Sequence, residues 1–160
     1  MANNRAKKFE NRFMTDWLET VPESICYRLY DTMGGYKNIG NVGDFICYKY
    51  PNIYLLDCKS IQGNTLPFSD LRQYDQMLKY KEILGVAVGF IVWFVDHDSV
   101  LWIPVQTMEK IKTEGLKSFN INKMTPDNYF FLEIPSKKLR TFLKSDYSSL
   151  VEYYYKKSWY

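Results

Sequence analysis

The chain has 160 residues, of which 46% are hydrophobic and 24% charged, and its formal net charge is +3. These values predict one globular domain over residues 1–160 and exclude a low-complexity chain. The net charge alone is too small to indicate a polyanionic partner. The longest apolar run, residues 86–95, is too short to span a membrane, and the polar, basic N-terminal segment lacks the apolar stretch of a signal peptide. A cytoplasmic protein without a membrane partner is expected.

Residues 4–20 form the first predicted helix, because Phe9, Phe13 and Trp17 recur at every fourth position and a proline follows at position 22. Glu10 lies beside this apolar stripe, and the pattern by itself makes it a surface residue. A strand is predicted at residues 25–30. The glycine-rich segment 31–43 follows and is predicted to project as a loop, although an ordinary mobile loop fits the same composition.

The stretch 43–59 is predicted to form two strands joined by a turn at residues 50–52. Asp44 opens the first strand, and Asp57 and Lys59 close the second. Since side chains alternate along a strand, Leu55, Asp57 and Lys59 should share one face. Two carboxylates brought together by the hairpin suit a hard cation such as Mg²⁺ or Mn²⁺. A lysine at that place would orient a nucleophile or offset developing charge.

A further helix is predicted from Asp70 to about Leu84, with Asp70 as its N-cap and Gln73 three residues later in a capping-box arrangement. The continuous apolar run 86–95 predicts a strand at the centre of the sheet, covered on both faces. His97 stands between two aspartates, which could indicate a metal site. A hairpin turn is the preferred interpretation, because Asp and Ser are turn-forming residues.

The remaining elements expected are a strand at 100–105, a helix at 107–114, a strand at 130–133 and a helix at 136–143. The aromatic tail 153–160 is expected to pack on the body or on a partner subunit. Three cysteines in predicted strands, without a CxxC spacing, indicate reduced, buried thiols. The C-terminal segment is locally basic, which favours either a phosphate-binding surface or a solvated face; its residues include Lys137, Lys138, Arg140 and Lys144.

The spacing Asp44-(x)12-Asp57-x-Lys59 resembles the PD-(D/E)xK nuclease signature, with Gly43 where that family usually has proline. Further runs are similar to RecU-type Holliday junction resolvases. They are the opening Asn-Arg-Ala-Lys-Lys-Phe-Glu at residues 4–10, the Leu-Pro-Phe loop at 66–68, and Gln73 twelve residues before Gly85. The resemblance covers roughly residues 4–105.

This resemblance implies a restriction-endonuclease-like α/β fold, with a mixed central β-sheet flanked by helices, and Mg²⁺- or Mn²⁺-dependent endonuclease action on Holliday junctions or other branched DNA. It implies metal ligands at Asp44, Asp57 and Glu10, with Lys59 and Gln73 as further catalytic candidates. A homodimer is implied, because resolving a junction needs two symmetric nicks. The predicted DNA-contacting residues are Arg5, Lys7, Lys8, Tyr36, Lys37, Arg72, Lys137, Lys138 and Arg140.

Two alternatives stay open at this point. One is another nuclease of the same fold, a restriction or repair enzyme acting on linear duplex. The other is a catalytically silent DNA-binding recombination factor. The structural roles of Glu10 as a surface residue and of Gln73 as a helix cap also remain open.

Overall fold

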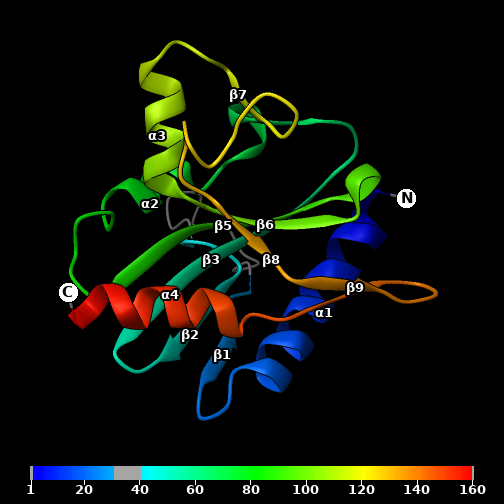
Figure 1. Cartoon of the computed structure of the whole chain (residues 1–160), viewed down its shortest axis with the longest axis vertical. Coiled ribbons are helices and arrows are strands. Elements are labelled where there is room, and N and C mark those ends of the chain that lie inside the picture. The colour runs from blue at the N-terminus through cyan, green and yellow to red at the C-terminus, as the bar shows by residue number, and fades with distance from the viewer. Residues whose placement is uncertain (1, 31–40, 160) are drawn as a thin grey trace.

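A computed structural model describes residues 2–30 and 41–159. Within them, helices flank a six-stranded mixed sheet on both faces, with the strand order β1-β2-β3-β5-β6-β8 (Figure 1). The central pair β3 and β5 is parallel, and the other neighbouring strands are antiparallel. Two small antiparallel pairs, β4 with β7 and β9 with β10, lie outside this sheet.

The helices and strands have the following bounds in the described part of the chain. The helices are α1 (Ala2–Thr20), α2 (Tyr74–Leu78), α3 (Val105–Thr113) and α4 (Ser148–Trp159). The strands are β1 (Ile25–Arg28), β2 (Phe45–Lys49), β3 (Asn52–Ile61), β4 (Thr65–Pro67), β5 (Val86–Phe94), β6 (Ser99–Pro104), β7 (Ser118–Asn120), β8 (Leu132–Ile134), β9 (Ser136–Lys138) and β10 (Leu143–Ser145).

Each face of the sheet carries its own apolar core. On one face, Phe13 and Trp17 of α1 and Leu150 of α4 pack on alternate residues of β2, β3 and β6. On the other face, the short helix α2 and the helix α3 cover β3, β5 and β6 through residues such as Met77 and Met108. Strand β5 is therefore buried from both sides, as its continuous apolar sequence predicts.

Most of the predicted elements are present, and three predictions about local structure are wrong. The helix expected over residues 70–84 is limited to α2, and Leu84, where that helix was expected to end, is 96% exposed. Asp70 belongs to a separate 3-10 turn (Phe68–Asp70), and no side-chain cap bond forms at Gln73, so the capping box is absent. Residues 136–143 form the β9–β10 hairpin instead of a helix.

The turn interpretation of His97 is confirmed. Residues Val95–His97 form a 3-10 turn that ends at Asp98 in the left-handed region, and His97 Nε2 lies 2.7 Å from Asn64 Oδ1. The three cysteines are free and buried, as predicted. The aromatic tail packs on the body through α4, where Tyr154 accepts a hydrogen bond from Trp102 Nε1 at 3.0 Å. None of the helices in the described residues combines the length and apolar composition needed to cross a bilayer.

Asp16 fastens α1 to β10. Its carboxylate is 1% exposed, accepts hydrogen bonds from Arg12 and accepts one from the backbone N–H of Ser145 at 2.9 Å. We expect Asp16→Leu to lower the free energy of unfolding by about 3 kcal/mol, because it leaves a buried N–H unpaired and leaves the Arg12 guanidinium with only the more distant Glu19, at 4.0 Å, as a counterion. Urea unfolding followed by circular dichroism would measure the loss.

Glu19→Ala provides the matched control, since Glu19 is also an acid of α1 that pairs with a cation of β10, Lys144 Nζ, at 3.3 Å. Both partners are about half exposed, and exposed pairs contribute little. A loss for Asp16→Leu no larger than that for Glu19→Ala would contradict the assigned role of Asp16.

Candidate active site

The hairpin β2–β3 places Asp44, Asp57 and Lys59 at one edge of the sheet. Strand β2 begins at Phe45, opposite Leu56, whereas β3 continues to Ile61. Just before β2 begins, the side chain of Asp44 replaces the backbone as the hydrogen-bond partner of β3, because Asp44 Oδ2 accepts a hydrogen bond from the backbone N–H of Cys58 at 2.9 Å. The backbone of Asp44 also donates to Leu56 O at 2.8 Å. The first predicted acid is thereby fixed against the strand that carries the second.

Gly43 has a specific role in this approach. Its φ is +156°, and a Cβ at this position would collide with the carbonyl oxygen of Leu56. The proline usual in the resembled nucleases is replaced here by the residue that allows this close contact. Glycine in place of the usual proline at position 43 therefore allows the backbone that carries Asp44 to lie against β3.

Asp57 is a buried carboxyl group with an unusual electrostatic environment. Its side chain is 1% exposed, and Lys59 Nζ lies 3.2 Å from Asp57 Oδ2. Burial, followed by the negative charge of Asp44, raises the pKa of Asp57 to about 8, and Lys59 opposes this rise. Such a displaced carboxyl pKa beside a second acid and a lysine is characteristic of functional sites.

Glu10 reaches the same neighbourhood from α1. It forms a salt bridge with Arg28 of β1, and Arg28 also donates to Asn11 Oδ1 at 2.7 Å. Burial and the negative charge of Asp44 raise the pKa of Glu10, while Arg28 and Lys59 lower it. The structure thus brings Glu10 within the electrostatic range of the Asp44–Asp57–Lys59 group, with Arg28 holding its carboxylate.

The donor set fits a divalent cation better at the aspartates than at Glu10. Among the described residues Asp57 Oδ2 is buried and accepts no well-aligned hydrogen bond, although Lys59 Nζ lies 3.2 Å away; it stands beside a second carboxylate, an arrangement that a hard cation can satisfy. Across residues 2–30 and 41–159, no three His, Cys, Asp or Glu side chains are grouped closely enough to hold an ion together. Glu10 is engaged by Arg28, and its predicted role as a third metal ligand stays a prediction.

Gln73 lies on the side of the sheet to which Asp57 belongs by strand alternation. It is the residue preceding α2, and α2 packs in the core cluster that contains Leu55. Within the described residues its side-chain oxygen is buried and accepts no hydrogen bond. The capping role is absent, and a role for Gln73 at the candidate site stays a prediction.

The predicted DNA-contacting residues fall into separate groups. Tyr36 and Lys37 lie outside the described residues, as do residues 31–40 of the predicted projecting loop. Arg72 is exposed beside Gln73. Arg5 and Lys8 line a cavity of about 680 Å³ between α1 and the β9–β10 hairpin, together with Arg12, Trp93 and Phe142. Lys7 is exposed on the same helix.

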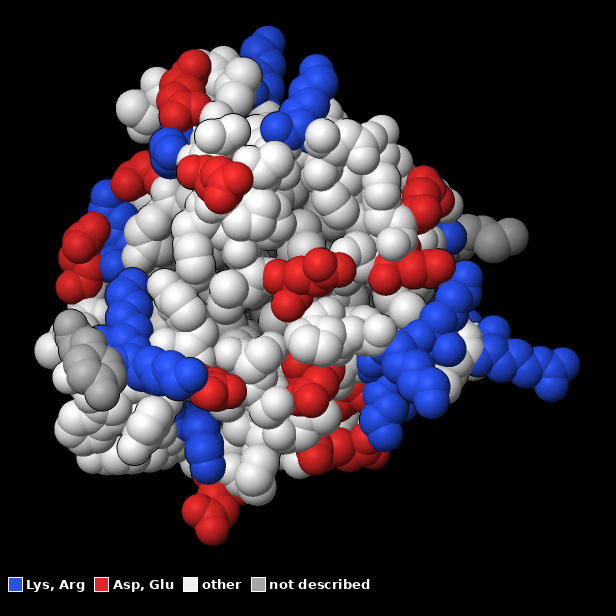
Figure 2. Space-filling view, in the orientation of Figure 1, with Lys and Arg blue, Asp and Glu red and all other residues white. Residues whose placement is uncertain are grey.

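The β9–β10 hairpin carries the other basic group, whose members Lys137, Lys138, Arg140 and Lys144 are all exposed. Figure 2 shows Lys and Arg side chains gathered on the side of the molecule where β9 projects in Figure 1. Two of these cations have partners, since Lys138 pairs with Asp98 at 3.0 Å and Lys144 with Glu19. The cavity beside α1 thus joins the two basic groups, which we call the basic surface.

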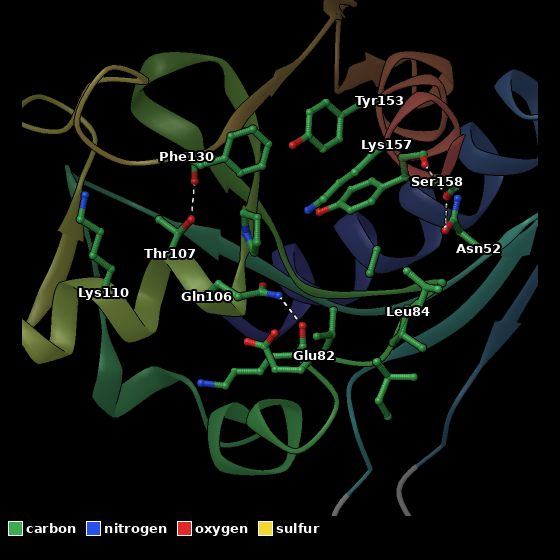
Figure 3. Close-up of a pocket in the computed structure, with 18 residues that line it drawn as sticks. Asn52, Glu82, Leu84, Gln106, Thr107, Lys110, Phe130, Tyr153, Lys157 and Ser158 are labelled. Atoms are coloured by element: carbon green, nitrogen blue, oxygen red, sulfur yellow. Dashed lines mark hydrogen bonds between the residues drawn. The ribbon is translucent and has the colours of Figure 1, made fainter. Parts of the chain in front are cut away.

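A second cavity, of about 560 Å³, lies where β3 and β5 begin (Figure 3). Phe130 and Tyr153 stack along it with ring centroids 5.0 Å apart, and Gln106 Nε2 donates to Lys81 O at 2.8 Å. None of the predicted site residues lines this cavity. The carboxylate pair at the edge of β2 and β3 is therefore the better candidate for metal-dependent chemistry.

Sequence reasoning missed Arg28 and Asp16. Arg28 meets Glu10 across 18 positions of the chain, and no local spacing connects the two residues. Asp16 lies four positions after Arg12, a spacing that indicates a helical ion pair. That spacing could have identified the pair, although not its burial against β10.

Comparisons with known proteins agree with this architecture. No protein-family profile matches the chain, and no curated protein sequence matches it. Among solved structures, the Holliday junction resolvase Hjc from the archaeal hyperthermophile Archaeoglobus fulgidus is similar, with a TM-score of 0.52 and 14% sequence identity. The similarity covers 72% of this chain and 86% of that chain. The predicted fold class is confirmed: the chain has a mixed α/β fold like that of a resolvase nuclease.

Proposed function

We propose that this protein is a metal-dependent endonuclease that resolves Holliday junctions or related branched DNA, as RecU-type resolvases do. The observation that carries the proposal is the buried Asp57 beside Asp44 and Lys59 in a resolvase-like fold. Neither the fold nor the packing requires two acids and a lysine at this edge. Their desolvation is unfavourable in the absence of a ligand, which favours a functional role.

Asp44 and Asp57 would hold Mg²⁺ or Mn²⁺, with Glu10 as a further candidate ligand. When bound, such an ion acidifies a water molecule and stabilises charge on a phosphate oxygen. Lys59 stands 3.2 Å from Asp57 and is 25% exposed, so it can orient an attacking water and offset negative charge on the phosphate. Gln73, whose buried side-chain oxygen accepts no hydrogen bond from the described residues, stays the proposed residue that would hold a water or a phosphate at this site.

The basic surface is proposed to bind DNA phosphates. Helix α1 connects it with the carboxylate pair, because α1 carries Glu10 and also contributes Arg5, Lys8 and Arg12 to the cavity beside the hairpin. A DNA strand held along this helix would be anchored by phosphate contacts that carry no sequence information. Tyr36, Lys37 and Arg72 stay predicted contacts to the junction.

Two symmetric nicks require two copies of the site, so we propose a homodimer as the acting form. The buried, unpaired state of all three cysteines is consistent with the reducing cytoplasm in which we expect the enzyme to act. The alternatives are a nuclease of this fold that acts on linear duplex and a DNA-binding factor without turnover.

The testing experiment is a cleavage assay on a four-way junction and on its linear arms, with Mg²⁺, with Mn²⁺ and with chelator. The proposal expects metal-dependent paired nicks in the junction and little cleavage of the arms. Equal cleavage of arms and junction would favour a restriction or repair enzyme. Junction binding without nicking in either metal would favour the silent binding factor.

Charge removal on the β9–β10 hairpin tests the basic surface. Lys137 and Arg140 pair with no carboxylate in the part of the chain that the structure describes, so both are available to phosphates. We expect Lys137→Ala with Arg140→Ala to flatten the slope of log affinity against log salt by up to about 1.8, since each neutralised phosphate contributes about 0.9. Fluorescence anisotropy with labelled junction DNA at several salt concentrations would measure it.

The pair Lys117→Ala with Lys123→Ala is the matched control, because it removes the same charge from exposed positions around β7, away from the hairpin. Its slope of log affinity against log salt should equal that of the wild type. If the hairpin variant also keeps the wild-type slope, the hairpin is only a solvated structure. The phosphate contacts would then belong to α1 alone.

A further inference from the structure

The cavity of about 560 Å³ at the beginning of β3 and β5 is separate from the carboxylate pair. Its volume lies in the range of cavities that hold small organic ligands. Helix α4 lines it from one side, and α3 with the segment before β5 lines it from the other (Figure 3). Asn52 lines it from the first residue of β3, five residues before Asp57, so about 16 Å of strand separates the cavity from the candidate active site.

An aromatic wall lies along this cavity. Phe130 and Tyr153 stack with their ring centroids 5.0 Å apart and an angle of 28° between the ring planes. Phe130 is 39% exposed, so the stack leaves part of the Phe130 ring accessible from the cavity that it lines. Exposed aromatic rings bind flat ring systems, because stacking removes apolar surface from water on both partners. The wall therefore favours a ligand with a planar ring.

Lys157 supplies a positive charge one helical turn after Tyr153. Residues four apart on a helix share a face, and Figure 3 shows the Lys157 side chain extending from α4 into the cavity. Its Nζ lies 5.8 Å from the centroid of the Tyr154 ring, and no carboxylate among the described residues pairs with it. The other two lysines of the cavity already have oxygen partners, in the pairs Lys81–Glu109 and Lys110–Asn128. Lys157 therefore favours a ligand with an anionic group.

Polar groups suited to the edge of a ring also line the cavity. Asn52 is 3% exposed, and its Oδ1 accepts a hydrogen bond from Ser158 Oγ at 3.0 Å. Its Nδ2 makes no well-aligned hydrogen bond with the described residues, and a buried amide is unfavourable until an acceptor meets it. Glu82 and Gln106 lie on the α3 side of the cavity (Figure 3). Their side-chain oxygens can accept hydrogen bonds from amino and hydroxyl groups.

We propose that this cavity binds a nucleotide, with the base against Phe130 and the phosphate on Lys157. A nucleotide joins a planar ring to an anion, and Tyr153 and Lys157 present the matching features about 5 Å apart along α4. A purely apolar ligand would leave Lys157 and Asn52 unpaired, and inorganic phosphate would leave the aromatic wall uncovered. The nucleotide is either free or the end of a DNA strand, since both present the same base and phosphate. The proposal does not rest on the proposed function, because the carboxylate pair takes no part in it.

Calorimetric titration of the full chain, in the presence of chelator, tests the proposal with deoxyadenosine monophosphate. This probe should bind with a Kd below about 1 mM, at least about tenfold more tightly than deoxyadenosine or inorganic phosphate. Lys157→Gln and Phe130→Ala should each weaken its binding about tenfold, because they remove the phosphate contact and the stacking contact. The matched controls are Lys156→Gln and Tyr155→Ala, neighbours on α4 that do not line the cavity, and both should bind like the wild type.

A 5′-phosphorylated trinucleotide distinguishes the two sources when it is titrated into the variant with Lys137→Ala and Arg140→Ala, whose basic surface is weakened. Binding that is tighter than that of the mononucleotide, and that Lys157→Gln weakens, assigns the cavity to a DNA strand end. Equal or weaker binding of the trinucleotide assigns it to a free nucleotide.

Three results would overturn the proposal. They are the absence of saturable mononucleotide binding up to about 5 mM, binding that both cavity variants leave unchanged, and binding no tighter than that of inorganic phosphate. Lys157 is exposed, so Lys157→Gln reports on the site even if Phe130→Ala perturbs folding. A protein that binds the mononucleotide in the cavity but fails to cleave junctions would keep this site and lose the proposed function alone.

Discussion

Asp57→Asn is expected to abolish junction cleavage, with a loss of at least about a thousandfold in turnover. The substitution keeps the shape of the side chain and removes one of the two negative charges proposed to hold the metal. A thousandfold loss corresponds to about 4 kcal/mol of transition-state stabilisation, a reasonable share for a metal ligand. Single-turnover cleavage of a labelled four-way junction at saturating enzyme would measure it.

Junction affinity should be unchanged or higher in this variant, because a negative charge facing DNA phosphate is removed. Asp75→Asn serves as the control, since Asp75 is an exposed acid of the neighbouring helix α2, and it should cleave normally. Wild-type turnover in Asp57→Asn would remove Asp57 from the reaction. Equal losses in cleavage and in junction affinity would indicate instead that the substitution disturbs the DNA-binding surface of the protein.

The metal-free protein should lose stability as the pH rises, and Asp57 should account for much of that loss. The pKa of this carboxyl is raised to about 8 by burial and by Asp44, from an ordinary value of 3.8. The folded state therefore binds a proton that the unfolded state releases across this window. The free energy of unfolding falls by up to about 1.4 kcal/mol per pH unit between roughly pH 4 and pH 8, and levels off above.

Asp57→Asn removes this titratable carboxyl group, so it should flatten the dependence of the free energy of unfolding on pH and make the variant more stable than the wild type near pH 8. Urea unfolding in the presence of chelator at pH 5, 6.5 and 8 measures how the free energy of unfolding changes with pH in the wild type and in the variant. Added Mg²⁺ should stabilise the wild type most at pH 8, where ionisation costs least, and should leave the variant unaffected. Parallel slopes for the two proteins would show that Asp57 ionises normally in the fold.

The sequence predicts the central sheet well because the relevant signals are local. The alternation through Leu55, Asp57 and Lys59 and the proline at position 51 locate the β2–β3 hairpin, and the apolar run after Gly85 locates β5. Each of these patterns is contained within one element. The carboxylate pair follows from them, because hairpin pairing brings the start of β2 next to the end of β3.

Other elements depend on contacts that no local pattern reveals. The β9–β10 hairpin is held by the bond from Ser145 N–H to Asp16 on α1 and by Asp146 N–H donating to Pro135 O at 2.8 Å. Its lysine-rich sequence, read alone, favours a helix after a proline. The salt bridge between Arg28 and Glu10 likewise depends on the packing of α1 against β1. The sequence could therefore identify Glu10 as a candidate but not its partner.

The parallel pairing of β3 with β5 also sets when the candidate site can form during synthesis. Its register joins Asp57 to Phe90 and Lys59 to Val92, so the strand that carries both side chains gains its inner neighbour only after β5 exists. Long-range parallel pairing forms slowly because the intervening chain must first be closed into a loop. In a nascent or truncated chain that ends before β5, the strand that carries Asp57 and Lys59 therefore lacks its inner neighbour, and the proposed nuclease activity should await a nearly complete fold.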